Sequence, residues 1–297
     1  MENSINFKSG YVGIVGKPNV GKSTLLNKLV GQKIAIVSPK PQTTRNKILA
    51  IMSDEAYQVV FTDTPGFHKP KNKLGENMIK AVDDTISDVD LILMVVEPEE
   101  LISTAEEKIL EKIGNIPAIL AINKCDTVKF EQALPVIDAY NKKHTFLDIV
   151  PISAKTGMNI DVLKDVILSH LEQGPMYYPE DMVTDQQEKQ IVAEIIREKM
   201  LNLLDKEVPH GIAIEIVKMK YTDSGMYTVS ANIYCEKESH KGIIIGKGGQ
   251  TLKKIGMLAR VECEQMLEEK VFLELWVKVK PDWRNSNNLM KEIGITE

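Results

Sequence analysis

The sequence predicts two domains in series, an α/β domain with a mostly parallel sheet flanked by helices and then an α+β domain. In the first, apolar runs typical of buried strands alternate with segments of helical spacing, and a glycine-rich segment joins the first strand to the first helix. The stretch 171–181, with its glycine, prolines and tyrosines, breaks that alternation. We therefore place the first domain at 1–172, a linker at 173–184 and the second domain at 185–297.

Size and composition limit the possible functions. A chain of 297 residues is long for a single hydrophobic core, and its net charge of −5 gives no global attraction to nucleic acid or membranes. Any RNA contact therefore needs a local basic patch. Three cysteines without a C-x-x-C pair indicate reduced thiols. With no signal-peptide pattern and no membrane-length apolar run, we expect a cytoplasmic protein that can still touch a membrane surface.

The first motif runs from Gly16 to Ser23 and reads Gly-Lys-Pro-Asn-Val-Gly-Lys-Ser. It fits the phosphate-binding pattern G-x-x-x-x-G-K-[ST], between an apolar strand at 11–15 and a helix at 24–30. A glycine turn with a chance lysine is the alternative, and the flanking strand and helix argue against it. We expect Lys22 to pair with the β- and γ-phosphates and Ser23 to bind Mg²⁺. The expected nucleotide-binding residues here are Gly16, Lys17, Pro18, Asn19, Val20, Gly21, Lys22, Ser23 and Thr24.

Two later segments are expected to face the same phosphates. We expect a threonine hydroxyl from the polar connection 31–45 to complete the coordination shell of Mg²⁺. We favour Thr44 for this role over Thr43. Asp63-Thr64-Pro65-Gly66 follows a strand, which suits Asp63 for a hold on Mg²⁺ and leaves the Gly66 N–H near the γ-phosphate. The residues assigned to catalysis are Lys22, Thr44 and Gly66, and those assigned to the metal are Ser23, Thr44 and Asp63. Residues 67–75 are expected to form a loop that orders with GTP.

Two more motifs are expected to determine which nucleotide base is bound. Asn123-Lys124-Cys125-Asp126 ends a predicted strand at 117–122. The Asp126 carboxylate can accept from both N1–H and the exocyclic amine of guanine, whereas adenine offers no such pair of donors. This favours GTP over ATP. Ser153-Ala154-Lys155 follows another strand and is expected to close over the guanine O6 through backbone N–H groups.

The four motifs at 16–23, 63–66, 123–126 and 153–155, in this order, resemble those of the translation-factor-related GTPases over residues 10–170. The form of the first motif narrows the resemblance to the Era/TrmE/Der group of small bacterial GTPases. Phe67 stands where related enzymes carry a water-orienting glutamine, which implies slow intrinsic hydrolysis. The resemblance also implies, as a hypothesis, that Asn19 helps to bind K⁺. His68 is a candidate to position water, although a solvated loop histidine is the commoner role.

The second domain has its own element order. We predict a helix at 185–205, strands at 212–217 and 226–235 joined by a turn, and a helix at 239–245. The segment Gly246-Lys247-Gly248-Gly249, a helix at 251–267 and a strand at 271–279 follow. This order resembles a type II KH domain over 185–280, which implies a groove for about four unpaired RNA bases. Trp283 and Arg284, in the tail, either contact RNA or pack as an end segment.

The G-x-x-G segment and its neighbours carry the expected RNA contacts. Its glycines permit a tight turn that faces a phosphate chain, Ile243, Ile244 and Ile245 line the groove, and lysines supply the positive patch. The expected RNA-binding residues are Lys241, Ile243, Ile244, Gly246, Lys247, Gly248, Gly249, Lys253 and Lys254. A plain glycine turn on a lysine-rich surface is the alternative, and the full element order argues against it.

Taken together, the two domains resemble the Era family from end to end. The resemblance implies a GTPase that binds GTP or GDP with Mg²⁺ and has a role in small (30S) ribosomal subunit assembly and 16S rRNA 3′-end maturation. It implies the 16S rRNA 3′ end and the small subunit as partners, no DNA, a monomer, and peripheral association with the inner face of the cell membrane. We expect the GTP state to gate RNA binding. The alternatives are a signalling GTPase with a protein or membrane effector and a tRNA-modifying GTPase, for which no modification site is evident.

Overall fold

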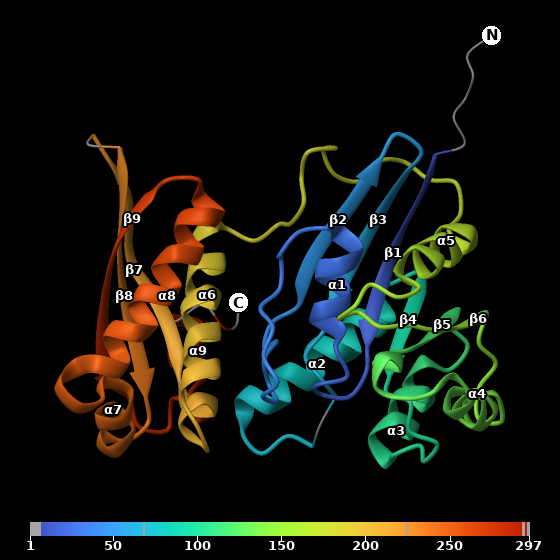
Figure 1. Cartoon of the computed structure of the whole chain (residues 1–297), viewed down its shortest axis with the longest axis horizontal. Helices are drawn as coiled ribbons and strands as arrows, with labels where there is room; N and C mark the ends of the chain where they lie inside the picture. The colour runs from blue at the N-terminus through green and yellow to red at the C-terminus, as the bar shows by residue number, and fades with distance from the viewer. Residues whose placement is uncertain (1–6, 68, 224, 293–294, 296–297) are drawn as a thin grey trace, which may run out of the picture. The chain divides into compact units, whose positions relative to one another are not determined.

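The computed structural model describes residues 7–67, 69–223, 225–292 and 295, and its elements are shown in Figure 1. Contacts divide the chain into two compact units. The first unit contains Met1–Ala35, Thr44–Pro70 and Gly75–Asp185, and the second contains Ile36–Thr43, Lys71–Leu74 and Gln186–Glu297. The short stretch 36–43 therefore belongs to the second unit, although both of its neighbours in sequence belong to the first.

A six-stranded sheet forms the centre of the first unit. Its strands are β1 (Lys8–Val15), β2 (Ile48–Asp54), β3 (Tyr57–Asp63), β4 (Leu91–Val96), β5 (Ala118–Ile122) and β6 (Asp148–Pro151). They lie in the order β2-β3-β1-β4-β5-β6, and every neighbouring pair is parallel except β2 with β3. Every residue of β4 is buried, as expected for a central strand that helices cover on both faces.

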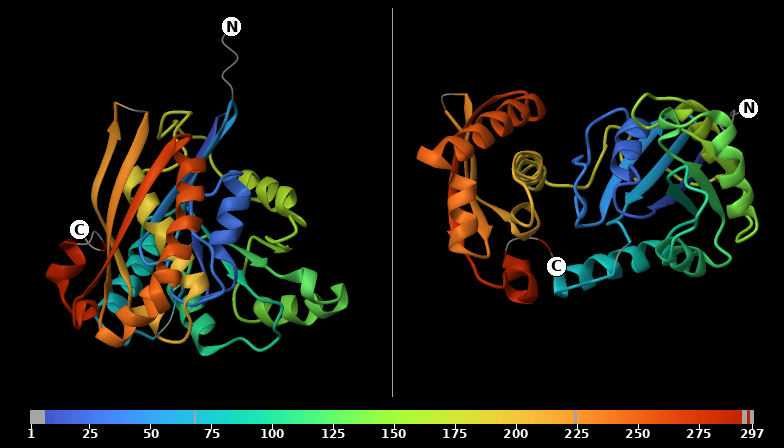
Figure 2. Two further views of the ribbon diagram at one scale, coloured as in Figure 1. Left: turned by 60° about the vertical axis from the view of Figure 1, so that its left-hand side comes forward. Right: turned by 60° about the horizontal axis from the view of Figure 1, so that its bottom comes forward.

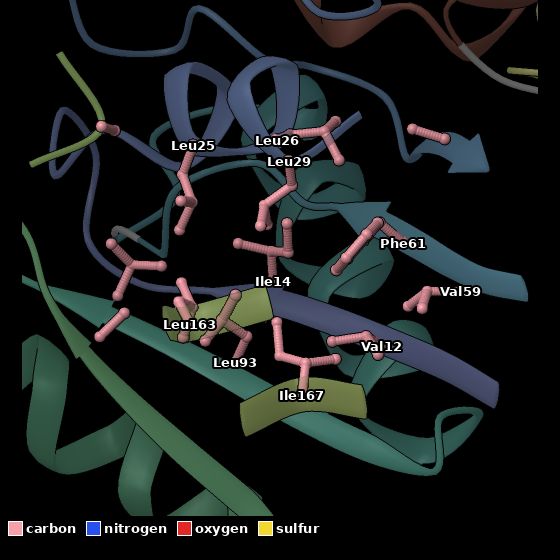
Figure 3. Close-up of a cluster of buried hydrophobic side chains, with 14 of the residues drawn as sticks. Val12, Ile14, Leu25, Leu26, Leu29, Val59, Phe61, Leu93, Leu163 and Ile167 are labelled. Atoms are coloured by element: carbon pink, nitrogen blue, oxygen red, sulfur yellow. The ribbon is translucent and has the colours of Figure 1, made fainter. Parts of the chain in front are cut away.

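Helices cover both faces of this sheet (Figures 1 and 2). The helices are α1 (Lys22–Val30), α2 (Lys73–Ser87), α3 (Thr104–Ile113), α4 (Ala133–Asn141) and α5 (Ile160–His170), with short 3-10 turns at Cys125–Thr127 and Phe130–Gln132. One core joins α1 and α5 to the sheet, as Figure 3 shows for Leu25, Leu163 and the strand residue Ile14. A separate core joins α2, α3 and α4 to the other face. Both cores hold the carboxyl ends of the parallel strands at one edge, where the motifs lie.

The second unit contains a three-stranded sheet with helices packed on one face. Its elements are α6 (Glu188–Leu203), β7 (Ala213–Thr222), β8 (Met226–Cys235), α7 (Glu238–Ile245), α8 (Gln250–Leu267), β9 (Lys270–Val279) and α9 (Asn287–Glu292), with 3-10 turns at Val208–Gly211, Lys247–Gly249 and Trp283–Asn285. β8 pairs with β7 antiparallel and with β9 parallel. The core lies between this sheet and helices α6 and α8.

The expected linker and the C-terminal tail both make defined contacts. Residues 173–184, expected as a linker, bond to the first unit: the Gly174 N–H donates to the Phe7 carbonyl (3.1 Å) and the Thr184 hydroxyl to the Leu49 carbonyl (2.7 Å). The tail packs as an end segment, because Trp283 is fully buried and its Nε1–H donates to the Gly211 carbonyl (2.9 Å). No helix in the described parts of the chain is long and apolar enough to span a bilayer.

Candidate functional site

The glycine-rich motif joins β1 to α1, as its sequence predicts. Helix α1 begins at Lys22, so its first N–H groups point toward the space in front of the loop. The Lys22 side chain is buried, and its Nζ donates to the carbonyls of Gly16 (3.1 Å) and Lys17 (2.9 Å). Lys17 itself pairs with the buried Glu106 (3.2 Å). The loop therefore folds around a lysine ammonium at the amino end of a helix, which is an arrangement suited to phosphate.

Three oxygen-bearing side chains meet beside this lysine. The Ser23 Oγ lies 2.7 Å from Asp63 Oδ2 and 2.9 Å from Thr44 Oγ1, and the Thr44 hydroxyl also lies 3.2 Å from Asp63 Oδ2. Asp63 is fully buried, and its Oδ1 makes no hydrogen bond of normal geometry with a described residue. Thr43 turns away and donates to the Lys40 carbonyl (2.6 Å). A hard divalent cation such as Mg²⁺ fits this oxygen cluster and its unpartnered carboxylate atom.

Burial shifts the pKa values of Lys22 and Asp63 in opposite directions. Burial lowers the pKa of the Lys22 ammonium to about 8, and the neighbouring Asp63 carboxylate opposes that shift. Burial also raises the pKa of Asp63, against the effects of Lys22 and the hydroxyls of Ser23 and Thr44. Burial therefore disfavours the charged form of both groups, and a bound phosphate chain with a divalent cation would favour it.

Gly66 and Phe67 lie against the glycine-rich loop. A Cβ on Gly66 would stand 2.6 Å from the Pro18 Cα, so only glycine fits, and the Phe67 N–H donates to the Gly16 carbonyl (3.1 Å). The Phe67 ring is buried in the core on the α2–α4 side of the sheet. Since its side chain points inward and carries no polar atom, it cannot orient a water molecule. His68 lies outside the described residues.

The expected base-recognition residues come from the ends of β5 and β6. Asn123 is buried and joins two segments, because its Nδ2 donates to the Val20 carbonyl (2.7 Å) and its Oδ1 accepts from the Ala154 N–H (2.9 Å). The Ser153 hydroxyl donates to Asp126 Oδ1 (2.7 Å), and Asp126 is exposed. The structure thus brings together all four predicted motifs. Lys124, whose ammonium pairs with Glu97, and the exposed Lys155 flank this position.

The G-x-x-G segment of the second unit forms the predicted tight turn between α7 and α8. Gly246 has a φ of 74°, and a Cβ there would lie 2.1 Å from the Thr251 Oγ1. Lysines surround this turn and make no ion pair with a described residue: Lys241, Lys247, Lys253 and Lys254. One expectation needs correction. Ile244 is fully buried in the core, so it cannot contact a base, whereas Ile243 is 51% exposed.

Both halves of the chain match known protein families. The family described as "50S ribosome-binding GTPase" matches residues 11–124, and the KH domain family matches residues 207–284. GTPase Era of Clostridium novyi (strain NT) is 52% identical over 293 residues, which cover 98% of this chain and 100% of that protein. The chain belongs to the Era family. It is accordingly a GTP-hydrolysing enzyme with a KH domain.

Other members of the family agree in length and fold. GTPase Era of Clostridium botulinum (strain Okra / Type B1) is 51% identical over 290 residues, with 97% of this chain and 98% of that protein covered. Two crystal structures of Era each match with a TM-score of 0.95 at 43% identity, over 98% of this chain and 100% of theirs. One is a variant from Aquifex aeolicus bound to GDP.AlF4−, and the other is in complex with MgGDPNP and nucleotides 1506–1542 of 16S ribosomal RNA.

Sequence reasoning missed one residue that contacts the stretch 36–43. Arg197 of α6 is 2% exposed and donates to the carbonyls of Thr43 and Gln42, immediately before Thr44 in the chain. Next to it, Glu198 accepts from the Val37 N–H (2.9 Å). The only signal in the sequence is an arginine among core positions of an amphipathic helix, which becomes informative once its partners are known.

Proposed function

We propose that this enzyme is a GTP-controlled RNA-binding factor in the assembly of the small (30S) ribosomal subunit, and that it binds the 3′ end of 16S rRNA. The observation that carries the proposal is the presence in one chain of a nucleotide site and a lysine-flanked G-x-x-G turn. An Era relative has been solved with MgGDPNP and 16S rRNA nucleotides together, which supports the same pair of ligands here.

In this proposal the first unit binds GTP or GDP with Mg²⁺. Lys22 and the first N–H groups of α1 hold the phosphates, Asp126 reads guanine, and Asn123 fixes the loops that surround the base. Ser23, Thr44 and Asp63 are the residues that would hold Mg²⁺, which when bound neutralises charge on the β- and γ-phosphates. Gly66 allows its backbone to approach the γ-phosphate, because the contact with Pro18 leaves no room for a side chain.

Hydrolysis is expected to be slow without a further charge, because the buried Phe67 ring cannot orient water. We assign to the exposed Asn19 a role in binding K⁺, whose charge would stabilise the transition state. The measurement is the single-turnover rate of GTP hydrolysis in K⁺ and in Na⁺ at equal ionic strength, for the natural protein and for Asn19→Ala. A rate that is the same in both salts would remove K⁺ from the proposal.

The nucleotide state would reach the second unit through the stretch 36–43. This stretch clusters with the second unit and is held there by Arg197 and Glu198. The next residue, Thr44, lies in the oxygen cluster with Ser23 and Asp63. A change at Thr44 when the γ-phosphate leaves would therefore act directly on a segment bonded to α6, and in this way bias RNA binding.

Cosedimentation with purified small ribosomal subunits tests the proposal. The informative variant is Lys247→Asp/Gly248→Asp, which places negative charge in the G-x-x-G turn. The matched control is Lys206→Asp, because Lys206 is an exposed lysine of the same unit with a left-handed φ of 56°. We expect the turn variant to lose subunit binding and the control to keep it. Equal binding by the natural protein, the turn variant and the control would show that the G-x-x-G turn has a structural role and does not contact the subunit.

A signalling role with a protein or membrane effector is the second candidate, favoured if the turn variant binds subunits normally. We propose a cytoplasmic monomer that can reach the inner face of the cell membrane. Flotation with anionic lipid vesicles and sedimentation equilibrium test these two points. Binding to vesicles that depends on GTP while subunit binding does not would favour the signalling role.

A further inference from the structure

The sheet of the second unit has one covered face and one open face. Helices α6 and α8 lie on the covered face (Figures 1 and 2). Alternate residues of the central strand β8 point into the core there and are fully buried, namely Val229, Ala231, Ile233 and Cys235. The residues between them, starting at Met226, must therefore point to the other face. We call this other side the open sheet face; along β8 it is partly exposed from Met226 to Ser230, whereas Asn232 and Tyr234 at its far end are buried.

The pairing register shows which side chains share the open sheet face. Thr228 of β8 pairs with Lys220 of β7 and with Phe272 of β9. Four residues further along β9, Trp276 pairs with Asn232. Between these two rows, Ser230 pairs with Lys218 and with Glu274. The open sheet face therefore has a floor of small polar side chains, with aromatic rings along β9 and lysines along β7.

The two aromatic rings are unusually exposed for such large side chains. Phe272 is 51% exposed and Trp276 is 62% exposed. Because four residues separate them on one strand, their Cα atoms lie about 13 Å apart. That spacing spans two or three nucleotides of an extended strand, and bases stack on rings of this kind in single-strand-binding proteins. Since β9 is an edge strand, both rings are also accessible from the side of the sheet.

The open sheet face carries more lysines than carboxylates and is therefore positive overall. Lys218, Lys220, Lys270 and Lys278 belong to this face by register, and none forms an ion pair with a described residue. Its two carboxylates are engaged by neutral groups instead. Glu215 accepts from the Asn232 Nδ2 (2.8 Å) and the Tyr234 hydroxyl (2.5 Å), and Glu274 accepts from the Ser230 hydroxyl (2.6 Å). Lys278 lies near enough to Glu215 to lower the pKa of that carboxyl, so Lys218, Lys220 and Lys270 supply most of the positive charge available to an external anion.

We propose that the open sheet face is a second surface for single-stranded RNA, in which Phe272 and Trp276 stack on bases while the lysines contact phosphates. The G-x-x-G turn joins α7 to α8. The two surfaces therefore lie on separate structural features of one unit. The charge favours a polyanion over a second copy of this chain, because two such faces would bring like charges together. The inference extends the proposed RNA-binding role but does not require the G-x-x-G groove.

Tryptophan fluorescence tests the proposal directly, because the chain has two tryptophans in opposite environments. Trp276 is 62% exposed and Trp283 is fully buried, so added RNA can quench only the first by stacking. We would titrate the full chain with single-stranded oligonucleotides of about 5 and about 15 nucleotides. The longer oligonucleotide should quench the tryptophan fluorescence of the natural protein. It should also quench that of Lys247→Asp/Gly248→Asp, at a higher RNA concentration, whereas the fluorescence of Trp276→Phe should not be quenched. Quenching that disappears in the turn variant at all RNA concentrations would overturn a second surface.

Affinity gives a second and independent readout. Phe272→Ala and Trp276→Ala should each weaken binding of the longer oligonucleotide by about 5- to 150-fold, which corresponds to the usual effect of losing one base–ring stack. Binding of the shorter oligonucleotide, which fits in the groove, should change less than twofold, which also shows that the variants are folded. Leu101→Ala, which removes an 87% exposed apolar side chain from the first unit, is the control.

A variant that changes only surface lysines tests the same surface without altering the packing of the aromatic rings. Lys218→Glu/Lys220→Glu changes only exposed side chains. It should also selectively weaken binding of the longer oligonucleotide, and the affinity that remains should depend less on salt. Unchanged affinity in both the aromatic and the lysine variants would refute the proposal. So would a blue shift of Trp276 emission that grows with protein concentration in the absence of RNA, because that result would assign the face to a second copy of this chain.

Discussion

Replacing Arg197 with methionine tests how the nucleotide site is connected to the second unit. The guanidinium is buried, makes hydrogen bonds with Glu194, and donates to the carbonyls of Gln42 and Thr43. Methionine keeps most of the apolar volume and removes every donor. We therefore expect the stretch 36–43 to lose one of its attachments to α6 while the helix itself remains.

The size of the effect follows from the individual bonds. The contact with Gln42 is long, at 3.5 Å, so the bond to the Thr43 carbonyl carries most of the attachment. A hydrogen bond with a charged donor contributes about 1.5–3 kcal/mol, or roughly 10- to 150-fold in the equilibrium between the bound and released stretch. Glu194 is partly exposed and can be solvated, so its lost partner adds little. The bond from the Val37 N–H to Glu198 remains, which makes the lower end of the range the better expectation.

The assay is the ratio of RNA affinities in the presence of a non-hydrolysable GTP analogue and of GDP. We expect this ratio to move toward one in Arg197→Met, and amide exchange of residues 36–43 to become faster. Lys189→Met is the matched control, since Lys189 is an exposed cation on the same helix. An unchanged ratio in a variant whose 36–43 amides do exchange faster would refute the reasoning, because the stretch would then be released without consequence for RNA.

Three further predictions concern the site and the thiols. Asp126→Asn should weaken GTP binding by about 10²-fold or more and improve binding of xanthine nucleotides, as competition with labelled GDP would show, because the carboxylate can no longer accept from both guanine donors; equal weakening for both bases would indicate misfolding instead. Gly66→Ala should lower the rate of GTP hydrolysis more than the affinity for GDP, because its Cβ would stand 2.6 Å from the Pro18 Cα and displace the segment next to the γ-phosphate; normal hydrolysis would show that the segment can shift freely. Burial raises the pKa of the Cys263 thiol to about 12, so this thiol should remain protonated and unreactive at pH 8 and react only in denaturant or toward very alkaline pH, whereas the partly exposed Cys125 should react first with a disulfide reagent. Rapid labelling of Cys263 in the native protein would contradict its placement in the core.

The nucleotide motifs could be located from sequence because their chemistry depends on backbone geometry. Gly66 illustrates this, since the motif predicts a close backbone approach and the structure supplies the neighbour, Pro18, that requires it. Two adjacent threonines in a polar loop do not show from sequence which one faces the phosphates; the contacts of Thr44 with Ser23 and Asp63 give the physical basis for choosing it over Thr43.

Features that depend on tertiary packing were harder to predict. Three consecutive isoleucines do not show which one faces the core, because each step along a helix turns by about 100°; the structure buries Ile244 and exposes Ile243. The role of 36–43 depends on Arg197, which is distant in sequence. Likewise, Phe272 and Trp276 looked like ordinary positions of an alternating strand, and only the packing of α6 and α8 shows which face of that strand stays open.

Our central claim is that one chain couples a GTP site to an RNA-binding surface. The most direct test is the affinity for a 16S rRNA 3′-end oligonucleotide, measured with a non-hydrolysable GTP analogue and with GDP, for the natural protein and for Lys247→Asp/Gly248→Asp. We expect strong binding that depends on the nucleotide and is weakened by at least tenfold in the variant. Binding that is the same with either nucleotide and in either protein would contradict the account.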